Sequence, residues 1–78
     1  MKTIMDLLKL TNSAADFEHS DDFISDGLLD SMDIQILASN IEDEYHVKLA
    51  GTDLMPMNFA NVDAIRDLLQ SHGVEGDI

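Results

Sequence analysis

The sequence predicts an all-α protein, a small bundle of three to four helices with a long first loop. Three segments carry apolar residues at the i, i+3, i+4 spacing of a helix that buries one face. The alternation at Val47 and Leu49 is too brief for a sheet. The 78 residues are short enough for one domain, which we expect to span 1–78, with a core from about residue 3 to 71 and a flexible tail at 72–78.

The first helix is expected over residues 3–10, where Ile4, Leu7 and Leu8 follow the helical spacing, and it should end near Thr11 or Asn12. A polar connection then runs to about residue 29. Structureless loops of this length are uncommon in compact domains. We therefore expect its apolar side chains to pin it across the ends of the helices: Phe17, Phe23, Ile24, Leu28 and Leu29.

The strongest helical pattern extends from Asp30 to Tyr45. Asp30 is a good N-cap, and Asp33 stands at the third helical position, where a capping box places an acceptor. Successive helical residues are rotated by about 100°. One arc of the helix therefore gathers the side chains that should be buried: Ile34, Leu37, Ala38, Ile41 and Tyr45.

Two apolar residues of this helix point away from the buried arc. Met32 and Ile36 share the opposite face with Ser39 and Asp43, so both should be exposed just past Ser31. Isolated exposed apolar residues are normal on protein surfaces. A small docking surface for a partner is the other interpretation.

The last part of the chain predicts one more long helix. Gly51 and Pro56 interrupt the preceding connection, which should contain a short helical turn around residues 56–60. Asn61 is placed to cap a helix over residues 62–72, and Gly73 follows its end. The apolar residues of this helix again lie at helical spacing: Val62, Ile65, Leu68 and Leu69.

The charge is strongly acidic and unevenly distributed. Sixteen acids and four bases give a formal net charge of −12, and no Lys or Arg occurs from Leu10 to Val47. Such a surface repels nucleic acid and anionic lipid. We expect partners with basic surfaces instead, bound in a salt-dependent way.

The chain contains no cysteine, which removes disulfides, thiolate metal ligands and a thiol nucleophile. Its apolar runs are too short for a membrane span, and the N-terminus lacks the apolar segment of a signal peptide. We therefore expect a cytoplasmic monomer with no membrane insertion.

Ser31 poses the main functional question, because it lies between acids at the predicted start of a helix. A catalytic serine needs a nearby base, but the three histidines are scattered and no G-x-S-x-G turn is present. A calcium loop starting at Asp22 would place Ile24 and Asp33 at ligand positions that they serve poorly. The sequence thus predicts neither a catalytic residue nor a metal site.

Two interpretations of Ser31 remain. Serine is common at helix starts, so it can be a structural residue only. Alternatively it is a modification site, because free backbone N–H groups at a helix N-terminus favour an attached phosphate. The structural interpretation does not explain why exposed apolar residues and an acidic surface gather around Ser31, and a modification site fits them better.

The segment GLLDSMDI, with Asp30, Ser31 and Met32, resembles the D-S-L signature of acyl carrier and peptidyl carrier proteins. The resemblance extends from about Ile4 to Gln70 and includes the DG-x-x-DS sequence that begins at Asp26. Further matching residues are Glu42, Asp43 and Glu44 with Tyr45 after them, and Asn58, Phe59, Val62 and Ile65 within NFANVDAI.

This resemblance implies a carrier domain that is not itself an enzyme. Ser31 would carry 4′-phosphopantetheine, derived from coenzyme A, as a phosphodiester, with Asp30 and Met32 beside the attachment point. Its partners would be a phosphopantetheinyl transferase and acyl- or aminoacyl-loading and condensing enzymes. The residues expected to bind these partners are Asp33, Ile36, Ser39, Glu42, Asp43 and Glu44.

Fatty-acyl, polyketide, aminoacyl and D-alanyl carriers share this attachment, and the partner enzymes mostly select the cargo. Met32 stands where leucine is commonest, and D-alanyl carrier proteins of cell-wall modification also show D-S-M. Ile36 stands where fatty-acid carriers commonly have an acid. A different class of function is the alternative: an acidic protein-interaction module without a prosthetic group.

Overall fold

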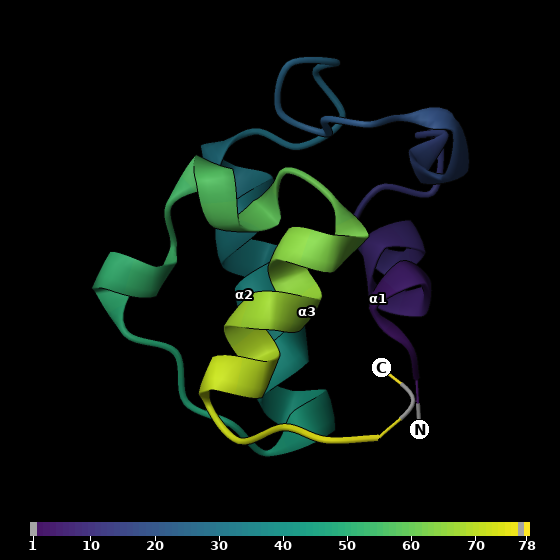
Figure 1. The fold of residues 1–78 in the computed structure, drawn as a ribbon. Coiled ribbons are helices and arrows are strands. Elements are labelled where there is room, and N and C mark those ends of the chain that lie inside the picture. The colour runs from purple at the N-terminus through teal and green to yellow at the C-terminus, as the bar shows by residue number, and fades with distance from the viewer. Residues whose placement is uncertain (1, 77) are drawn as a thin grey trace.

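Three α-helices surround the core of the protein: α1 (Ile4–Thr11), α2 (Ser31–Tyr45) and α3 (Val62–Ser71) (Figure 1). The computed structural model describes residues 2–76 and 78, and this part of the chain contains no strand. Three short 3-10 helices lie in the connections: η1 (Phe17–His19), η2 (Gly51–Asp53) and η3 (Pro56–Phe59). The prediction of a small all-α bundle is therefore confirmed, and the turn expected near Pro56 is η3.

Each α-helix begins at the side chain that caps it. Thr3 and Asp6 form a capping box at α1, and Asn61 accepts from the Ala64 N–H at the start of α3. Asp30 caps α2, as the sequence predicts. These side chains satisfy backbone N–H groups that have no partner within the helix, and so fix each first turn.

One hydrophobic core joins all three helices. Helix α1 packs against both α2 and α3, and α3 also packs against η3. The predicted arc of α2 faces this core, with Tyr45 partly buried at its end. The buried residues of the helices are Ile4, Leu7, Leu8, Ile34, Leu37, Ala38, Ile41, Phe59, Ile65, Leu68 and Leu69.

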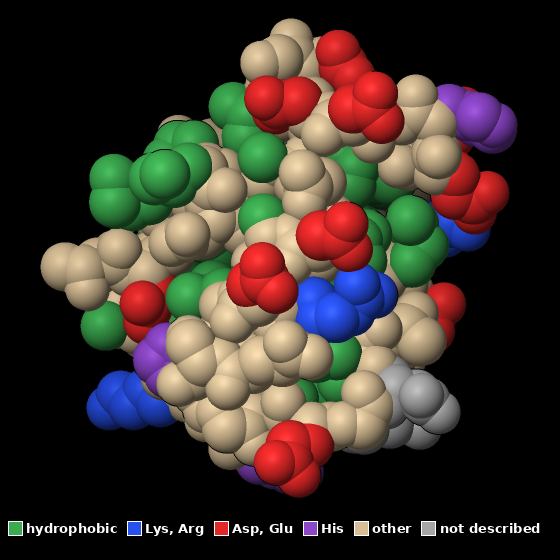
Figure 2. All heavy atoms as spheres, viewed as in Figure 1, with side chains coloured by type: hydrophobic (Ala, Val, Ile, Leu, Met, Phe, Trp, Pro, Cys, Tyr) green, Lys and Arg blue, Asp and Glu red, His purple; other side chains and the backbone are tan. Residues whose placement is uncertain are grey.

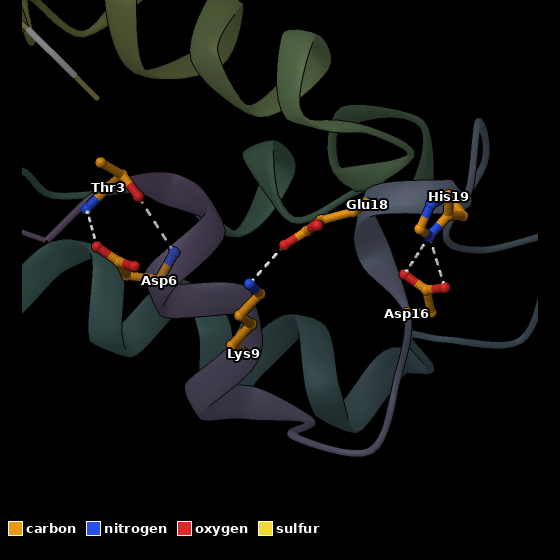
Figure 3. A network of polar contacts seen from close by, with 6 residues as sticks. All are labelled: Thr3, Asp6, Lys9, Asp16, Glu18 and His19. Carbon is orange, nitrogen blue, oxygen red and sulfur yellow. Dashed lines mark hydrogen bonds and ion pairs between the residues drawn. The ribbon is translucent and has the colours of Figure 1, made fainter.

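The long first connection is held down by its apolar residues. Phe17, Phe23 and Leu29 are buried, and the two rings meet edge to face with centroids 5.0 Å apart. The Phe23 N–H donates to the Ala60 carbonyl at 2.6 Å, which ties the connection to the segment before α3. Lys9 of α1 reaches across to Glu18 of η1 at 2.6 Å (Figure 3). Ile24 and Leu28 are only partly buried.

The segment after α3 contacts the core, whereas the sequence predicts a flexible tail from residue 72. Val74 packs against the core, and Ile78 is buried within it; residue 77 lies outside the described residues. The His72 ring nitrogen Nε2 lies 2.9 Å from Asp53 Oδ2 and links the end of α3 to η2. A short apolar pattern such as Val74 and Ile78 carries no periodicity, so sequence alone could not place it.

The packing of the first connection leads to a stability prediction. Leu29→Ala should lower the free energy of unfolding by about 2–5 kcal/mol, because it leaves a cavity under the connection. Leu10→Ala deletes the same atoms from an exposed position and should change this free energy by about 0.5 kcal/mol or less. Urea unfolding followed by circular dichroism measures both variants. Equal effects of the two substitutions would show that the connection is not part of the core.

Candidate functional site

Ser31 is the first residue of α2, and its side chain is exposed. Within the described part of the chain, no residue forms a hydrogen bond with its hydroxyl, and the N–H groups of Ser31 and Met32 donate no hydrogen bond. The hydroxyl thus stands in solvent beside two free backbone donors at the positive end of a 15-residue helix. This arrangement suits a group that carries negative charge.

Asp30 and Asp33 hold the backbone on both sides of Ser31. The Asp33 N–H donates to Asp30 Oδ1 at 2.8 Å, and the Asp30 N–H donates to Asp33 Oδ2 at 3.2 Å. This reciprocal pair is a complete capping box and fixes the first turn of α2. Asp33, expected to bind partners, therefore also has a structural function.

A tight turn precedes the serine and is organised by Asp22. Its carboxylate accepts the N–H groups of Ile24 and Ser25 at 3.0 and 3.1 Å, and the Ser25 hydroxyl at 3.1 Å. The hydrogen bond from the Ser25 backbone N–H is the main cause that lowers the pKa of Asp22 below its ordinary value of 3.8. Burial opposes it, and the bonds from the Ser25 hydroxyl and the Ile24 N–H add to the lowering. Gly27 then turns the chain with a φ of 73°, in the left-handed region that glycine adopts readily.

Met32 and Ile36 are exposed, as the sequence predicts, with 69% and 46% of their surface accessible. Ser39 and Asp43 are also exposed on this side of α2, so the structure brings these four residues to one surface. We call Met32, Ile36, Ser39 and Asp43 the outer face of α2.

The three acids at the end of α2 differ in their contacts. Glu42 accepts the Leu49 N–H at 2.8 Å, and Glu44 accepts the Lys2 N–H at 3.1 Å. Asp43 between them is exposed. Glu42 and Glu44 thus bind backbone within the protein, and Asp43 is the acid of this group that extends the outer face.

Sequence reasoning missed two exposed methionines next to α2. Met55 precedes η3 and Met57 lies within it, and η3 packs against α2. In Figure 2 hydrophobic side chains gather at the upper left, over η3, and acidic side chains lie along the top over the first connection. Nothing in the periodicity distinguished these methionines from core residues, because η3 is too short to show a pattern.

Two hollows occur beside the first connection. The larger, about 390 Å³, has an apolar floor that includes Phe17 and Phe23 and an acidic rim with Glu18, Asp21 and Asp63. The smaller, about 170 Å³, lies between Ile24 and Met57. Ser31 lines neither of them, so its hydroxyl is on an open surface.

Among residues 2–76 and 78, no three His, Asp or Glu side chains are grouped closely enough to hold a metal ion. No helix in these same residues is both long and apolar enough to cross a membrane.

No protein-family model, curated protein or solved structure gives a significant match to this chain. The functional interpretation therefore depends on the residues around Ser31. The D-S-M segment and the residues before it indicate which group Ser31 could carry. The position of Ser31 at the start of α2 leaves its hydroxyl accessible.

The capping box leads to a test of how the serine is positioned. Asp30→Ala should lower the free energy of unfolding by about 1 kcal/mol, because the Asp33 N–H loses its acceptor. Asp30→Asn keeps an acceptor oxygen at the same place and should retain most of that stability. Thermal unfolding of the two variants and the wild type measures the difference. An Asn variant as unstable as the Ala variant would contradict a capping function.

The turn at Asp22 leads to a prediction about acid. Because its pKa is lowered in the folded protein, the stabilisation from ionised Asp22 is present above about pH 3.8 and is lost as pH falls through the folded value. Asp22→Asn keeps the acceptor oxygen but cannot titrate. As pH falls below about 3.8, the unfolding free energy of this variant should therefore fall less steeply than that of the wild type. Urea titrations at several pH values measure the slope, and identical slopes would exclude the effect.

Proposed function

We propose that this protein is an acyl carrier protein, which carries acyl or aminoacyl groups as thioesters on a 4′-phosphopantetheine arm attached to Ser31. One observation carries the proposal. The exposed hydroxyl of Ser31 opens a long helix beside two backbone N–H groups that have no acceptor in the described part of the chain. The resemblance of GLLDSMDI to the carrier signature names the group that such a site would take.

The residues around Ser31 fit a phosphodiester. The N–H groups of the first turn and the helix dipole favour a negative charge at this position. Asp30 and Asp33 carry like charge, but each carboxylate already accepts a backbone N–H in the capping box. Both acids are at the surface, where solvent and salt weaken their repulsion of the phosphate.

The arm supplies what the chain lacks. With no cysteine, the protein has no thiol of its own on which to hold an activated acyl group. When attached, the arm provides a terminal thiol that forms thioesters.

Attachment requires only one group of this protein. The Ser31 oxygen forms a bond to the pantetheine-linked phosphorus of coenzyme A while the phosphoanhydride bond breaks. Adenosine 3′,5′-bisphosphate leaves, and the hydroxyl proton passes to a base of the transferase. Ser31 lies in the open, so a transferase has access to it, and the capping box fixes the backbone turn from which the hydroxyl projects.

The outer face of α2 is the proposed docking surface for the transferase and for loading and condensing enzymes. Met32 and Ile36 offer apolar contacts, and Asp43 offers a charge to basic partners. Central apolar contacts usually dominate the affinity of such surfaces, while charges at the rim raise association rates.

The second candidate is an acidic interaction module without an arm, and the exposed Met32 and Ile36 favour it as much as they favour a carrier. The two functions differ at Ser31. In an interaction module Ser31→Ala leaves partner binding intact, whereas a carrier loses its loading site.

Mass spectrometry tests the proposed function. Incubation with coenzyme A and a broad-specificity phosphopantetheinyl transferase should add one phosphopantetheine to the wild-type chain, and Ser31→Ala should abolish the addition. Ser13→Ala is the matched control, because Ser13 is an exposed serine outside α2 and its outer face, and it should load fully. A wild-type chain that stays unmodified would contradict the proposal.

The same assay tests the outer face. Met32→Glu should slow loading by about tenfold, the consequence of losing roughly 1.4 kcal/mol of contact energy in the transferase complex. Asp67→Ala changes an exposed residue of α3 and serves as the surface control. Equal loading rates of the Met32→Glu variant and the wild type would show that Met32 is not part of the docking surface.

A further inference from the structure

The sulfur of this chain resides entirely in methionine. It has five methionines and no cysteine. Met57, Met32 and Met55 are 72%, 69% and 50% exposed, whereas Met5 is partly buried against the core. Peroxides oxidise accessible thioethers most readily, because the oxidant must reach the sulfur atom.

We propose that Met32 is a redox-sensitive modification site, at which oxidation to the sulfoxide slows the loading of Ser31. The inference rests on the proposed carrier function. The oxidant is a hydroperoxide, such as hydrogen peroxide. Its terminal oxygen is transferred to the Met32 thioether, the O–O bond breaks, the sulfur is oxidised, and the hydroperoxide is reduced to an alcohol, which is water in the case of hydrogen peroxide.

The position of Met32 gives its oxidation a local effect. It follows Ser31 directly and lies on the outer face, so any enzyme that reaches the Ser31 hydroxyl must approach this side chain. The sulfoxide replaces a flexible apolar group by a polar and chiral one. An apolar pocket of a partner then has to desolvate the new S=O dipole without a matching donor.

The same position protects the fold from the modification. Met32 does not belong to the core, and the first turn of α2 is held by the carboxylates of Asp30 and Asp33 instead. The sulfoxide therefore changes the surface while the bundle remains folded. Met5 would have the opposite effect, because its side chain packs against buried residues.

Met57 provides a matched control within the same molecule. Its exposure equals that of Met32 within a few per cent, but it lies on η3 and not on α2. If both residues are oxidised to a similar extent but only Met32 oxidation slows loading, the effect depends on where the sulfoxide lies and not on oxidation in general.

The experiment treats the apo-protein with graded hydrogen peroxide and locates each added oxygen by peptide mass spectrometry. Met32 and Met57 should be oxidised before Met5. Loading by a phosphopantetheinyl transferase is then measured by intact mass for the wild type, Met32→Leu and Met57→Leu, each compared with its own untreated sample. Peroxide should slow the wild type and Met57→Leu by about tenfold and leave the rate of Met32→Leu unchanged.

Methionine sulfoxide reductase should restore the wild-type rate, and circular dichroism should show an unchanged fold at the dose that modifies Met32. Oxidation of Met5 before Met32, or an equal slowing of Met32→Leu, would overturn the inference. So would a wild-type rate that Met32 sulfoxide leaves unchanged. Failure of the untreated protein to load at all would instead contradict the carrier function, which separates the two proposals.

Discussion

The structure depends on how the central helix begins. Asp30 and Asp33 each accept the backbone N–H of the other, and this exchange sets the rotation of α2 from its first residue. The rotation turns Ile34, Leu37 and Ile41 into the core, and Met32 and Ile36 to the outside. The position of the Ser31 hydroxyl and the composition of the outer face are therefore consequences of a single local constraint. A shift of α2 by one residue in its register against the core would rotate every side chain by about 100° and move Met32 and Ile36 away from the outer face.

The many carboxylates divide between structural contacts and open surface. Backbone N–H groups donate to the carboxylates of Asp6, Asp22, Asp30, Asp33, Glu42, Glu44 and Asp53, and Glu18 pairs with Lys9. Asp21 and Asp43 are exposed. A net charge of −12 opposes compaction through self-repulsion. Contacts to backbone N–H groups offset part of this repulsion, which explains how so acidic a small domain closes one core.

The sequence was sufficient for features that depend on neighbouring residues. Caps, helical spacing and the Pro56 turn are local, and the bounds of α1 and α2 agree with their prediction within about a residue. The same periodicity predicted the exposure of Met32 and Ile36. It could not predict that Glu42 accepts the Leu49 N–H or that Glu44 contacts Lys2, because such contacts depend on the tertiary path of the chain. The packing of Ile78 and the η2 turn could not be predicted for the same reason.

One contact at the far end of α2 bears on how the domain can be joined to other proteins. The Tyr45 hydroxyl donates to the Lys2 carbonyl at 2.6 Å, which holds the start of the chain against the last turn of this helix. The 14 helical steps between Ser31 and Tyr45 correspond to about 21 Å along the helix axis. An affinity tag, fused enzyme or solid support attached at the N-terminus is therefore anchored at the end of α2 opposite the serine. Such a fusion leaves Ser31 at the opposite end of α2 from the linker.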